Sequence, residues 1–444
     1  MTTEPNRREI LHAIGGSVGA GALFGRASVG TAGARTTESW PQFGYDVANS
    51  GHAPGNTGPE GPIGERWGFD AGRVFGSPAV VHGIVYVASR FGTVYALNAV
   101  DGTELWSVEV GTDGHPELHL YGSPAVGDET VYVAEAIPGR DVGSVYALDA
   151  ATGDELWQFV DVGEVSSPPT VADGTVYVGS DDWNVYALDA EDGSEHWRFE
   201  TGGWVQTAPA VVGDTVYVGG WDVYALDATD GTERWRARPG APDYTAPAVV
   251  DDGVYVGCDD GNVYALDAAD GSERWRFETI DEVSTSPAVA DGTVYVGSHD
   301  FGVYAIDAGT GDERWRVSTG GKVYSSPSVV DETVYVGSHD GNVYGLDASD
   351  GTERWRFPIG DEVYSSPAVA DGSVYVGAYD DSAPSVYALG RGSDAGNEGR
   401  IESVLDRFDG PETAVGLGAL AVGGGYAAYR RFSRGEGDGD PSGE

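Results

Sequence analysis

Cysteine and lysine are almost missing from this chain of 444 residues. Cys258 is the single cysteine, so no disulfide can form within the chain and its rigidity must come from packing. Lys322 is the single lysine among 25 Lys and Arg, against 71 Asp and Glu, which gives a formal net charge of −46. A surplus of this size excludes a general attraction to nucleic acid phosphates or anionic lipid.

The acidity does not indicate disorder, because 40% of the residues are hydrophobic, 11% are aromatic, and they recur periodically. It predicts a strongly hydrated surface that stays soluble at high ionic strength, where screening suppresses self-repulsion. We therefore interpret the chain as salt-adapted. The alternative is an acidic face for a basic partner.

The N-terminus has the features of an export signal over residues 1–34. Twin arginines in Asn6–His12 precede a stretch of apolar and small residues that ends at Phe24, and Thr31–Ala34 provides an Ala-x-Ala cleavage pattern. Twin arginines before such a stretch resemble a twin-arginine signal, which exports folded proteins. An ordinary secretion signal is the alternative, and either one takes the protein out of the cytoplasm.

The C-terminus predicts a membrane anchor. Residues 413–429 carry no charge and approach the roughly 20 residues that a spanning helix needs. Arg430–Arg434 follows at once, whereas the linker 391–412 before the apolar stretch carries acidic residues. Positive charge marks the cytoplasmic side, so we expect a cytoplasmic tail over 430–444 and the body of the protein outside, anchored at the cell surface.

Between the termini, a unit of about 40 residues recurs. Each unit holds a Ser-Pro or Ala-Pro stretch, then "VYV", then "VYAL" or a close variant, then a tryptophan in a charged stretch. Two of its turns carry Asp-Gly, which is a strong hairpin signal. The tryptophans of the repeat are Trp67, Trp106, Trp157, Trp197, Trp235, Trp275, Trp315 and Trp355.

Four short strands with alternating side chains in every unit predict an all-β fold. We expect an eight-bladed β-propeller of four-stranded antiparallel blades over 67–390, preceded by a lead-in segment over 35–66. A linear solenoid is the alternative, but it would need distinct capping repeats, and none is visible.

The repeat resembles the pyrroloquinoline-quinone-type propeller family. Ala265–Trp275, "ALDAADGSERW", has Ala, Asp, Gly and Trp at the family's spacing, and Trp40–Gly51 is similar to the family's lead-in segment. The resemblance implies that the Ser-Pro stretch forms the innermost strand A of each blade. "VYV" then forms strand B, "VYAL" strand C and the Trp stretch the outer strand D. It also implies that the tryptophans dock between neighbouring blades, with a structural role.

The first tryptophan stretch, Gly64–Asp70, has no strands A to C before it, and the last blade stops after Val386–Gly390 without a strand D. We therefore expect the strand around Trp67 to complete the eighth blade and close the ring. Closure in this way removes an open sheet edge.

The rim formed by the B–C and D–A loops carries the insertions and the mouth of the central channel, and irregular loops on a rigid scaffold often carry function. Aromatic and basic residues recur just before the prolines of strand A. They predict a site for an anionic or peptide ligand. The alternative is that Lys322 only pairs with Glu282 and Glu362 on neighbouring blades. The candidate binding residues are Arg73, Phe75, His119, Tyr121, Trp204, Gln206, Tyr244, Lys322, Tyr324 and Tyr364.

Metal sites are not expected. "HPELH" (His115–His119) could hold a metal only on a helix, which Pro116 disfavours, so we interpret it as a loop. The "SHD" strings at Ser298–Asp300 and Ser338–Asp340 are interpreted as solvated B–C turns, with weak calcium binding as a minor alternative.

The family that the repeat resembles includes quinone-dependent alcohol dehydrogenases, which use an adjacent cysteine pair, a calcium ion and a catalytic aspartate. This chain has one cysteine and short rim loops, so no catalytic residue and no quinone are expected. The better resemblance is to the non-catalytic branch, which includes the propeller lipoprotein of the outer-membrane β-barrel assembly machinery. We therefore expect a monomeric binding or scaffold module for a protein or peptide. A quinone-dependent dehydrogenase and a surface adhesin or polysaccharide binder remain alternatives.

Overall fold

The computed structural model describes residues 38–392 except 112–118, 138–141, 242 and 380–383. The expected export signal, membrane helix and tail all lie outside the described residues, as do most of the loop insertions. Within the described ranges every regular element is a strand, and no helix is long and apolar enough to cross a membrane.

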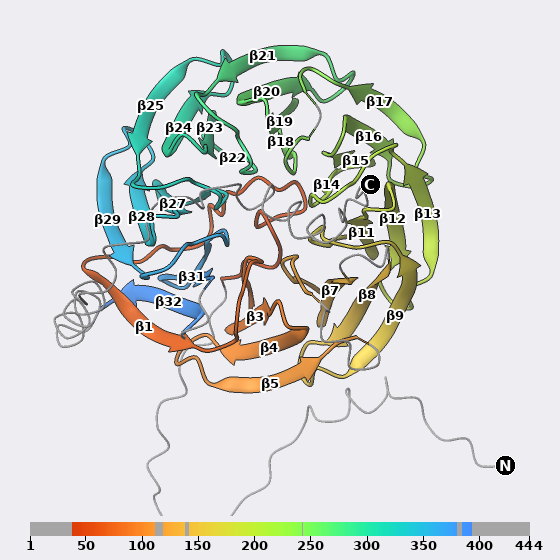
Figure 1. Cartoon of the computed structure of the whole chain (residues 1–444), viewed down its shortest axis with the longest axis horizontal. Helices are drawn as coiled ribbons and strands as arrows, with labels where there is room; N and C mark the ends of the chain where they lie inside the picture. The colour runs from red at the N-terminus through yellow and green to blue at the C-terminus, as the bar shows by residue number, and fades with distance from the viewer. Residues whose placement is uncertain (1–37, 112–118, 138–141, 242, 380–383, 393–444) are drawn as a thin grey trace, which may run out of the picture. The chain divides into compact units, whose positions relative to one another are not determined.

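The strands form eight four-stranded antiparallel sheets arranged as blades around a central axis, as expected (Figure 1). In each blade, strand A is innermost and strand D is outermost. Blades 1 to 4 comprise β2 (Ala79–Val81), β3 (Ile84–Ala88), β4 (Thr93–Asn98), β5 (Glu104–Glu109); β6 (Ala125–Gly127), β7 (Thr130–Ile137), β8 (Val142–Asp149), β9 (Glu155–Val162); β10 (Thr170–Ala172), β11 (Thr175–Gly179), β12 (Asn184–Asp189), β13 (Glu195–Glu200); and β14 (Ala210–Val212), β15 (Thr215–Val218), β16 (Val223–Asp227), β17 (Glu233–Ala237).

Blades 5 to 7 comprise β18 (Ala248–Val250), β19 (Gly253–Gly257), β20 (Asn262–Asp267), β21 (Glu273–Glu278); β22 (Ala288–Ala290), β23 (Thr293–Gly297), β24 (Gly302–Asp307), β25 (Glu313–Ser318); and β26 (Ser328–Val330), β27 (Thr333–Gly337), β28 (Asn342–Asp347), β29 (Glu353–Pro358). Blade 8 comprises β30 (Ala368–Ala370), β31 (Ser373–Gly377), β32 (Val386–Arg391) and β1 (Ile63–Phe69).

Blade 8 is completed from the other end of the chain, which confirms the expected closure. Strand β1 pairs antiparallel with β32, and Trp67 lies opposite Ala388. The outermost strand of the last blade therefore comes from the N-terminal side, and β32 is not left as an open edge.

Among the described residues, seven of the eight junctions between blades carry a hydrogen bond from a tryptophan of strand D. The indole Nε1 of Trp67 donates a hydrogen bond of 3.0 Å to the carbonyl oxygen of Ala99 in blade 1. Trp355, at the junction of blades 7 and 8, packs instead against the hydrophobic cluster around the closure strand; there β32 continues as a strand to Arg391, whereas blade 1 turns at the equivalent Ala99. The same bond joins six further pairs: Trp106–Ala150, Trp157–Ala190, Trp197–Ala228, Trp235–Ala268, Trp275–Ala308 and Trp315–Ala348.

The Asp-Gly turns between strands C and D take part in this docking. Gly102 has a φ of 71°, and a Cβ at that position would lie 2.7 Å from the Trp67 ring. A side chain there would strain the backbone and push the indole away, so this turn requires glycine both for its conformation and for the contact.

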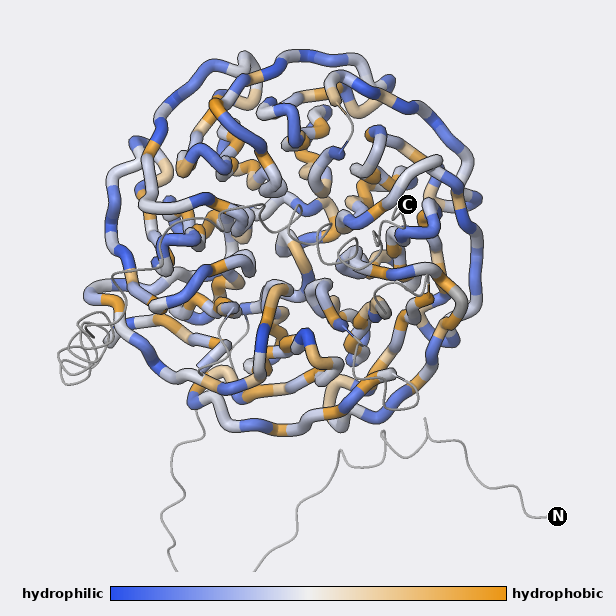
Figure 2. Tube along the Cα trace, viewed as in Figure 1, coloured by the Kyte–Doolittle hydropathy of each residue, from blue (hydrophilic) through white to orange (hydrophobic). Residues whose placement is uncertain are grey.

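The hydrophobic core lies between blades and not within a single centre. The valines and tyrosines of strands B and C are buried along both faces, whereas strand D exposes most of its side chains. Figure 2 shows this as hydrophobic segments on the inner strands and a hydrophilic outermost ring. The face of each sheet is covered by its neighbour, so the blades are stable only as a stack.

The lead-in segment crosses the central channel and contacts the innermost strand of every blade (Figure 1). Trp40 exchanges two backbone hydrogen bonds with Val80 of blade 1. The backbone N–H groups of blades 2 to 7 then donate in turn to successive positions of the segment, and Asn56 reaches blade 8. The strand A partners are Val126, Val171, Val211, Val249, Val289, Val329 and Val369.

These contacts satisfy backbone groups that would otherwise face the channel from the free edge of strand A. They also place the lead-in segment across the channel at the level of the A strands, so that it forms the base of the mouth on the B–C and D–A rim. The periodic pattern predicted the blades but not this path, because the lead-in segment has no repeat of its own.

We expect Trp67→Ala to lower the free energy of unfolding by about 3–5 kcal/mol, since it removes a buried indole from the junction that closes the ring. Chemical or thermal unfolding of the soluble body would measure the loss. Leu156→Ala, on the half-exposed face of another strand D, is the control and should change stability by about 0.5 kcal/mol or less. Unchanged stability of the Trp67 variant would contradict the closure role.

Asn56→Ala tests the lead-in segment. Its buried Nδ2 donates to the carbonyl oxygens of Ser39 (2.8 Å) and Val369 (2.7 Å). Asn56→Ala removes both hydrogen bonds to these carbonyl oxygens, so we expect the free energy of unfolding to fall by about 1–3 kcal/mol. Asn56→Asp has the same shape but places a negative carboxylate against both carbonyl oxygens, so it should lower the free energy of unfolding further. Equal stability of both variants and the natural protein would exclude a role for this contact.

Candidate functional site

Two sets of residues surround the mouth of the channel, one on the D–A loops and one on the B–C turns, and backbone hydrogen bonds join them blade by blade. The N–H of Arg90 donates to the carbonyl of Arg73 at 2.8 Å in blade 1. Corresponding bonds join five other pairs, listed from D–A loop to B–C turn: His119–Ala136, Glu164–Asp181, Glu282–His299, Lys322–His339 and Glu362–Tyr379. The residue on the strand B or B–C side of each pair was not among the residues that the sequence predicted to bind a ligand.

A chain of ring contacts follows the mouth across blades 2, 1, 8, 7 and 6. The ring centroid of Phe75 lies 5.7 Å from that of Tyr121, 5.7 Å from that of Tyr364 and 5.0 Å from that of Tyr379. The ring of His339 lies 4.3 Å from Tyr364 and continues the chain. We call this set the aromatic arc: His119, Tyr121, Phe75, Tyr379, Tyr364, His339, Tyr324 and His299.

Two arginines lie against the aromatic arc. The Arg73 guanidinium carbon is 4.7 Å from the Tyr379 ring centroid, and Arg73 also donates to the Tyr379 hydroxyl at 3.0 Å. The buried Arg90 lies 5.8 Å from the Phe75 ring centroid and 5.9 Å from that of Tyr121. Such cation–π contacts hold a guanidinium at a fixed place in a site that is partly desolvated.

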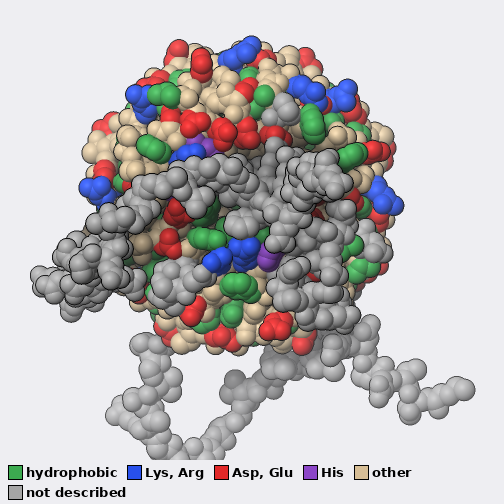
Figure 3. All heavy atoms as spheres, in the orientation of Figure 1, with side chains coloured by type: hydrophobic (Ala, Val, Ile, Leu, Met, Phe, Trp, Pro, Cys, Tyr) green, Lys and Arg blue, Asp and Glu red, His purple; other side chains and the backbone are tan. Residues whose placement is uncertain are grey.

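The opposite side of the mouth, on blades 3 to 5, has a different character. Gln206 donates to Asp181 at 2.9 Å, and Glu164 is buried beside them in blade 3. Tyr244 turns into the core: its side chain is buried, packs on Tyr264, and its hydroxyl accepts from the Gly240 N–H. Figure 3 shows basic and histidine side chains near the centre of the visible face, with acidic ones spread around them.

Of the residues predicted to bind, the structure brings Arg73, Phe75, His119, Tyr121, Tyr324 and Tyr364 together in or against the aromatic arc. Trp204 and Gln206 lie on blade 4, and Tyr244 is removed from the surface. In the described part of the chain Lys322 forms no ion pair with Glu282 or Glu362. Its charge acts instead on two histidines of the arc, His299 and His339.

The serines of the "SHD" turns and His299 are buried, and Asp300, His339 and Asp340 are partly buried, which corrects the interpretation of these turns as solvated. His299 is 1% exposed and packs edge-on against Tyr324, with the ring centroids 4.2 Å apart. The ring centroid of His339 lies 4.1 Å from that of Tyr324. Their position in the repeat could have identified these residues from the sequence. Arg90, His299, His339 and Tyr379 each follow the end of strand B by the same number of residues.

The three histidines of the arc are neutral at pH 7. Burial, reinforced by the Arg90 charge, lowers the pKa of His119 to about 4. Burial and the Lys322 charge lower the pKa of His299 to about 4, although its Nδ1 lies 2.9 Å from Glu282 Oε2. Burial also lowers the pKa of His339 to about 3 and raises that of Tyr121 to about 12.

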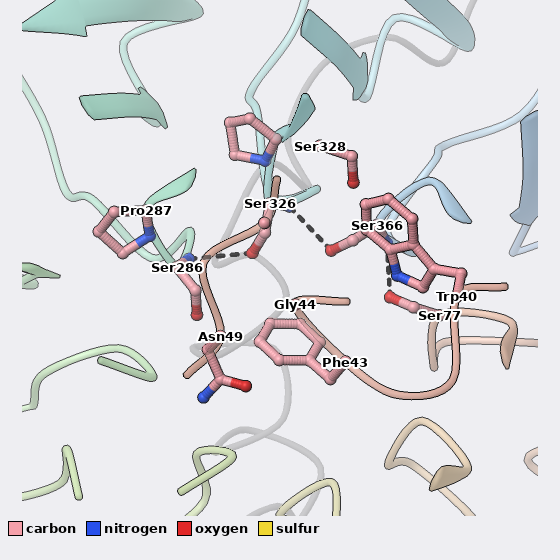
Figure 4. A pocket seen from close by; sticks show the side chains of 12 residues that line it. Trp40, Phe43, Gly44, Asn49, Ser77, Ser286, Pro287, Ser326, Ser328 and Ser366 are labelled. Carbon is pink, nitrogen blue, oxygen red and sulfur yellow. Dashed lines mark hydrogen bonds between the residues drawn. The ribbon is translucent and has the colours of Figure 1, made fainter. Parts of the chain in front are cut away.

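Under the arc, serines from the same five blades form a hydrogen-bonded chain, and Figure 4 shows its part from Ser286 to Ser77. The N–H of Ser286 donates to the hydroxyl of Ser326 at 2.9 Å, that of Ser326 to Ser366 at 3.0 Å, and that of Ser366 to Ser77 at 3.0 Å. The Ser77 N–H continues the chain to Ser123 at 2.8 Å. Each backbone N–H is thus paired with the neighbouring blade, which fixes the base of the aromatic arc.

The serines and the lead-in segment enclose a small cavity, lined on the segment's side by Trp40, Phe43 and Asn49 (Figure 4). Its free space of about 10 Å³ is enough for a water molecule. The base of the mouth is therefore narrow and built from both the blades and the lead-in segment, with serines, prolines and two aromatic rings around the cavity.

Metal-binding groups are not assembled in the part of the chain that the structure describes, where no three His, Cys, Asp or Glu side chains come together. Most of "HPELH" lies outside the described residues, and His119 belongs to the aromatic arc. Cys258 is buried, and this burial raises the pKa of its thiol, so it is not a reactive thiolate.

Comparison with known proteins decides the family. Residues 56–142, 141–276, 219–323 and 299–395 match the family described as outer membrane protein assembly factor BamB. This chain belongs to that family. A curated member, BamB of Salmonella typhimurium, is 41% identical over 101 residues, which is 22% of this chain and 24% of that protein. The matched stretch thus spans about a quarter of that BamB's length.

Solved structures share the propeller. BamB from Moraxella catarrhalis aligns with a TM-score of 0.62 at 19% identity, over 74% of this chain and 100% of that chain. Quinohemoprotein alcohol dehydrogenase from Comamonas testosteroni aligns with a TM-score of 0.67 at 17% identity, over 81% and 82% of the two chains. At such identities the likeness shows the fold alone, because BamB and an alcohol dehydrogenase both have it.

The neutral histidines predict a loss of stability in acid. Between about pH 6.5 and pH 4, the unfolded chain binds a proton at His299 and the folded protein does not, so stability falls as the pH falls. With His299→Gln, the fall in unfolding free energy between pH 6.5 and pH 4 should be smaller by on the order of 3 kcal/mol. Unfolding free energies measured at several pH values would show it, and an equal slope in the two proteins would contradict the assignment.

Proposed function

We propose that this chain is a binding module for a protein or peptide segment, and that the segment docks at the mouth on the B–C and D–A rim. The aromatic arc carries the proposal. It is a continuous set of rings spanning five blades, and two arginines are fixed against it.

Such an arrangement suits polypeptide recognition. Aromatic rings and arginine are the side chains that most often dominate binding energy at protein interfaces. Rings bury a large area with little loss of conformational freedom, and arginine adds several hydrogen-bond donors in a fixed planar arrangement. The serine chain and the lead-in segment hold the floor beneath Phe75 and Tyr364. A rigid floor reduces the entropy lost when a partner docks.

The family supports a protein partner. The matched relatives are named assembly factors, and that name implies contact with other proteins. We propose no catalytic residue, metal or quinone for this chain. The dehydrogenase fold relatives make quinone-dependent oxidation the competing outcome of the experiment below.

We also propose that the module works outside the cytoplasm, exported by residues 1–34 and anchored through 413–429. The outer-membrane location in the relatives' name supports a place in the cell envelope. Blade 8 ends on the rim opposite the mouth, because β32 is a strand C that runs toward the C–D turns. An anchor reached from there leaves the mouth facing away from the membrane.

Phe75→Ala and Tyr364→Ala, singly, test the site. Each removes a ring at the centre of the aromatic arc, and we expect partner capture from native membranes to fall by about tenfold or more. Val100→Ala, exposed on the opposite rim, is the matched control, and thermal unfolding of all variants separates binding from folding.

Equal capture by both arc variants and the control would refute binding at this mouth. Reduction of a redox dye with short alcohols, dependent on added quinone and calcium, would replace the scaffold function with an enzymatic one.

A further inference from the structure

Large apolar side chains are exposed on the turns of blades 3, 4 and 6, outside the aromatic arc. Trp183 is 47% exposed, Trp221 44%, Phe301 43% and Ile280 80%. Three of them sit on B–C turns and Ile280 sits on a D–A loop, so all belong to the same rim as the mouth. Scattered exposed residues are ordinary, but tryptophan and phenylalanine at loop tips of one rim are not.

Two of these residues are held in a backbone conformation that disfavours them. Trp183 has a φ of 75° and Phe301 a φ of 74°. The same turn position in blades 1, 5 and 7 is occupied by Gly92, Gly261 and Gly341, with φ values of 85°, 84° and 80°. Left-handed backbone is strained for a bulky aromatic residue and free of strain for glycine.

The fold does not need the aromatic side chains at these positions. The Trp183 carbonyl accepts hydrogen bonds from Thr201 N (2.8 Å) and Oγ1 (2.9 Å). The Gly261 carbonyl of blade 5 accepts the same pair from Thr279, both at 2.8 Å. Glycine therefore makes every backbone contact of the turn. Strain that persists beside a strain-free alternative points to function.

Neighbouring residues link the four exposed residues two by two. Thr201, bonded to the Trp183 carbonyl, also donates to the Gly203 carbonyl at 2.8 Å, and Trp221 lies directly against Gly203. At blade 6, the N–H of Ile280 donates to the carboxylate of Asp300, the neighbour of Phe301. We call these the blade 3–4 pair (Trp183, Trp221) and the blade 6 pair (Ile280, Phe301).

The surface around and between the two pairs is acidic. On the B–C turns and D–A loops from blade 3 to blade 6, Arg238 is the only lysine or arginine, and its charge is taken up by Asp222. The turn of blade 5, between the two pairs, carries Asp259 and Asp260. The other carboxylates of these loops are Glu164, Asp181, Asp182, Asp243, Asp281, Glu282 and Asp300.

We propose that the two pairs are the apolar anchors of a docking surface for a basic polypeptide segment that also carries apolar side chains. Its apolar residues contact the blade 3–4 pair and the blade 6 pair, and its arginines or lysines face the carboxylates between them. The acidic surroundings select a cationic chain, and the strained aromatics supply the contact area. The inference rests on the proposed function only for the class of partner, a polypeptide. Its surface, on blades 3 to 6, is separate from the aromatic arc.

Trp183→Gly and Phe301→Gly, singly and together, separate this role from a structural one. We expect the thermal midpoint to stay the same or rise, because glycine relieves the left-handed strain. Val100→Gly, on an exposed C–D turn of the opposite rim, is the matched control for loss of an exposed apolar side chain. A marked drop in the midpoint of the turn variants, unlike the control, would show that the rings are structural and would overturn the proposal.

The probe is a fluorescent peptide of about 12 residues alternating Arg and Leu, measured by anisotropy with the soluble body. We expect saturable binding, weakened about tenfold or more in the double glycine variant and unchanged in the control. Two companion peptides replace Arg by Glu or Leu by Ser, and both should bind at least about tenfold more weakly.

Binding that survives the double variant, or equal binding of the Leu-to-Ser peptide, would overturn the anchors. Equal binding of the Glu peptide would overturn the basic partner. Loss of binding to a soluble polysaccharide such as dextran in the glycine variants, with no peptide binding by the natural protein, would assign the aromatics to a glycan. Phe75→Ala in the same assay keeps the hypotheses apart: if it binds the peptide normally, this surface stands whether or not the aromatic arc has its own partner.

Discussion

The hydrogen bond from a tryptophan indole to an alanine carbonyl of the next blade is the interaction on which the molecule depends. A single blade has two apolar faces and cannot bury either one alone. The indole bond fixes the angle at which the next blade covers that face, and the glycine of the Asp-Gly turn lets the ring approach. Repeated around the axis, the bond produces a ring in which Trp67 must meet Ala99 for the circle to close.

Closing the ring creates the functional geometry. Eight innermost strands point their free edges at one axis, and the lead-in segment covers these edges. The segment thereby crosses the channel below a rim that carries the aromatic arc on five blades and carboxylates on the others. The repeat explains why the rim is regular, and its departures from the repeat explain why the two sides of the mouth differ in chemistry.

Much of the fold could be predicted because it rests on periodic, local signals. Trp67 without preceding strands and Val386–Gly390 without a following one are enough to predict the shared blade. The site was harder. Tyr244 was placed at the mouth by its distance from Pro247, but Asp243 adopts a φ of 83° and the ring enters the core. His299 and His339 were interpreted as solvated turn residues. Their burial depends on contacts with Tyr324 and Tyr364, which the local sequence does not reveal.

The lead-in segment has a further consequence, for cooperativity. Repeat arrays whose units touch only their neighbours can lose structure from one end while the rest stays folded. Here one stretch of chain, from Trp40 to Asn56, is bonded to blades at every position of the ring. Detaching any blade disturbs a segment that all the others share. The propeller should therefore unfold as one unit, and its inner strand edges should stay hidden from other chains until it does.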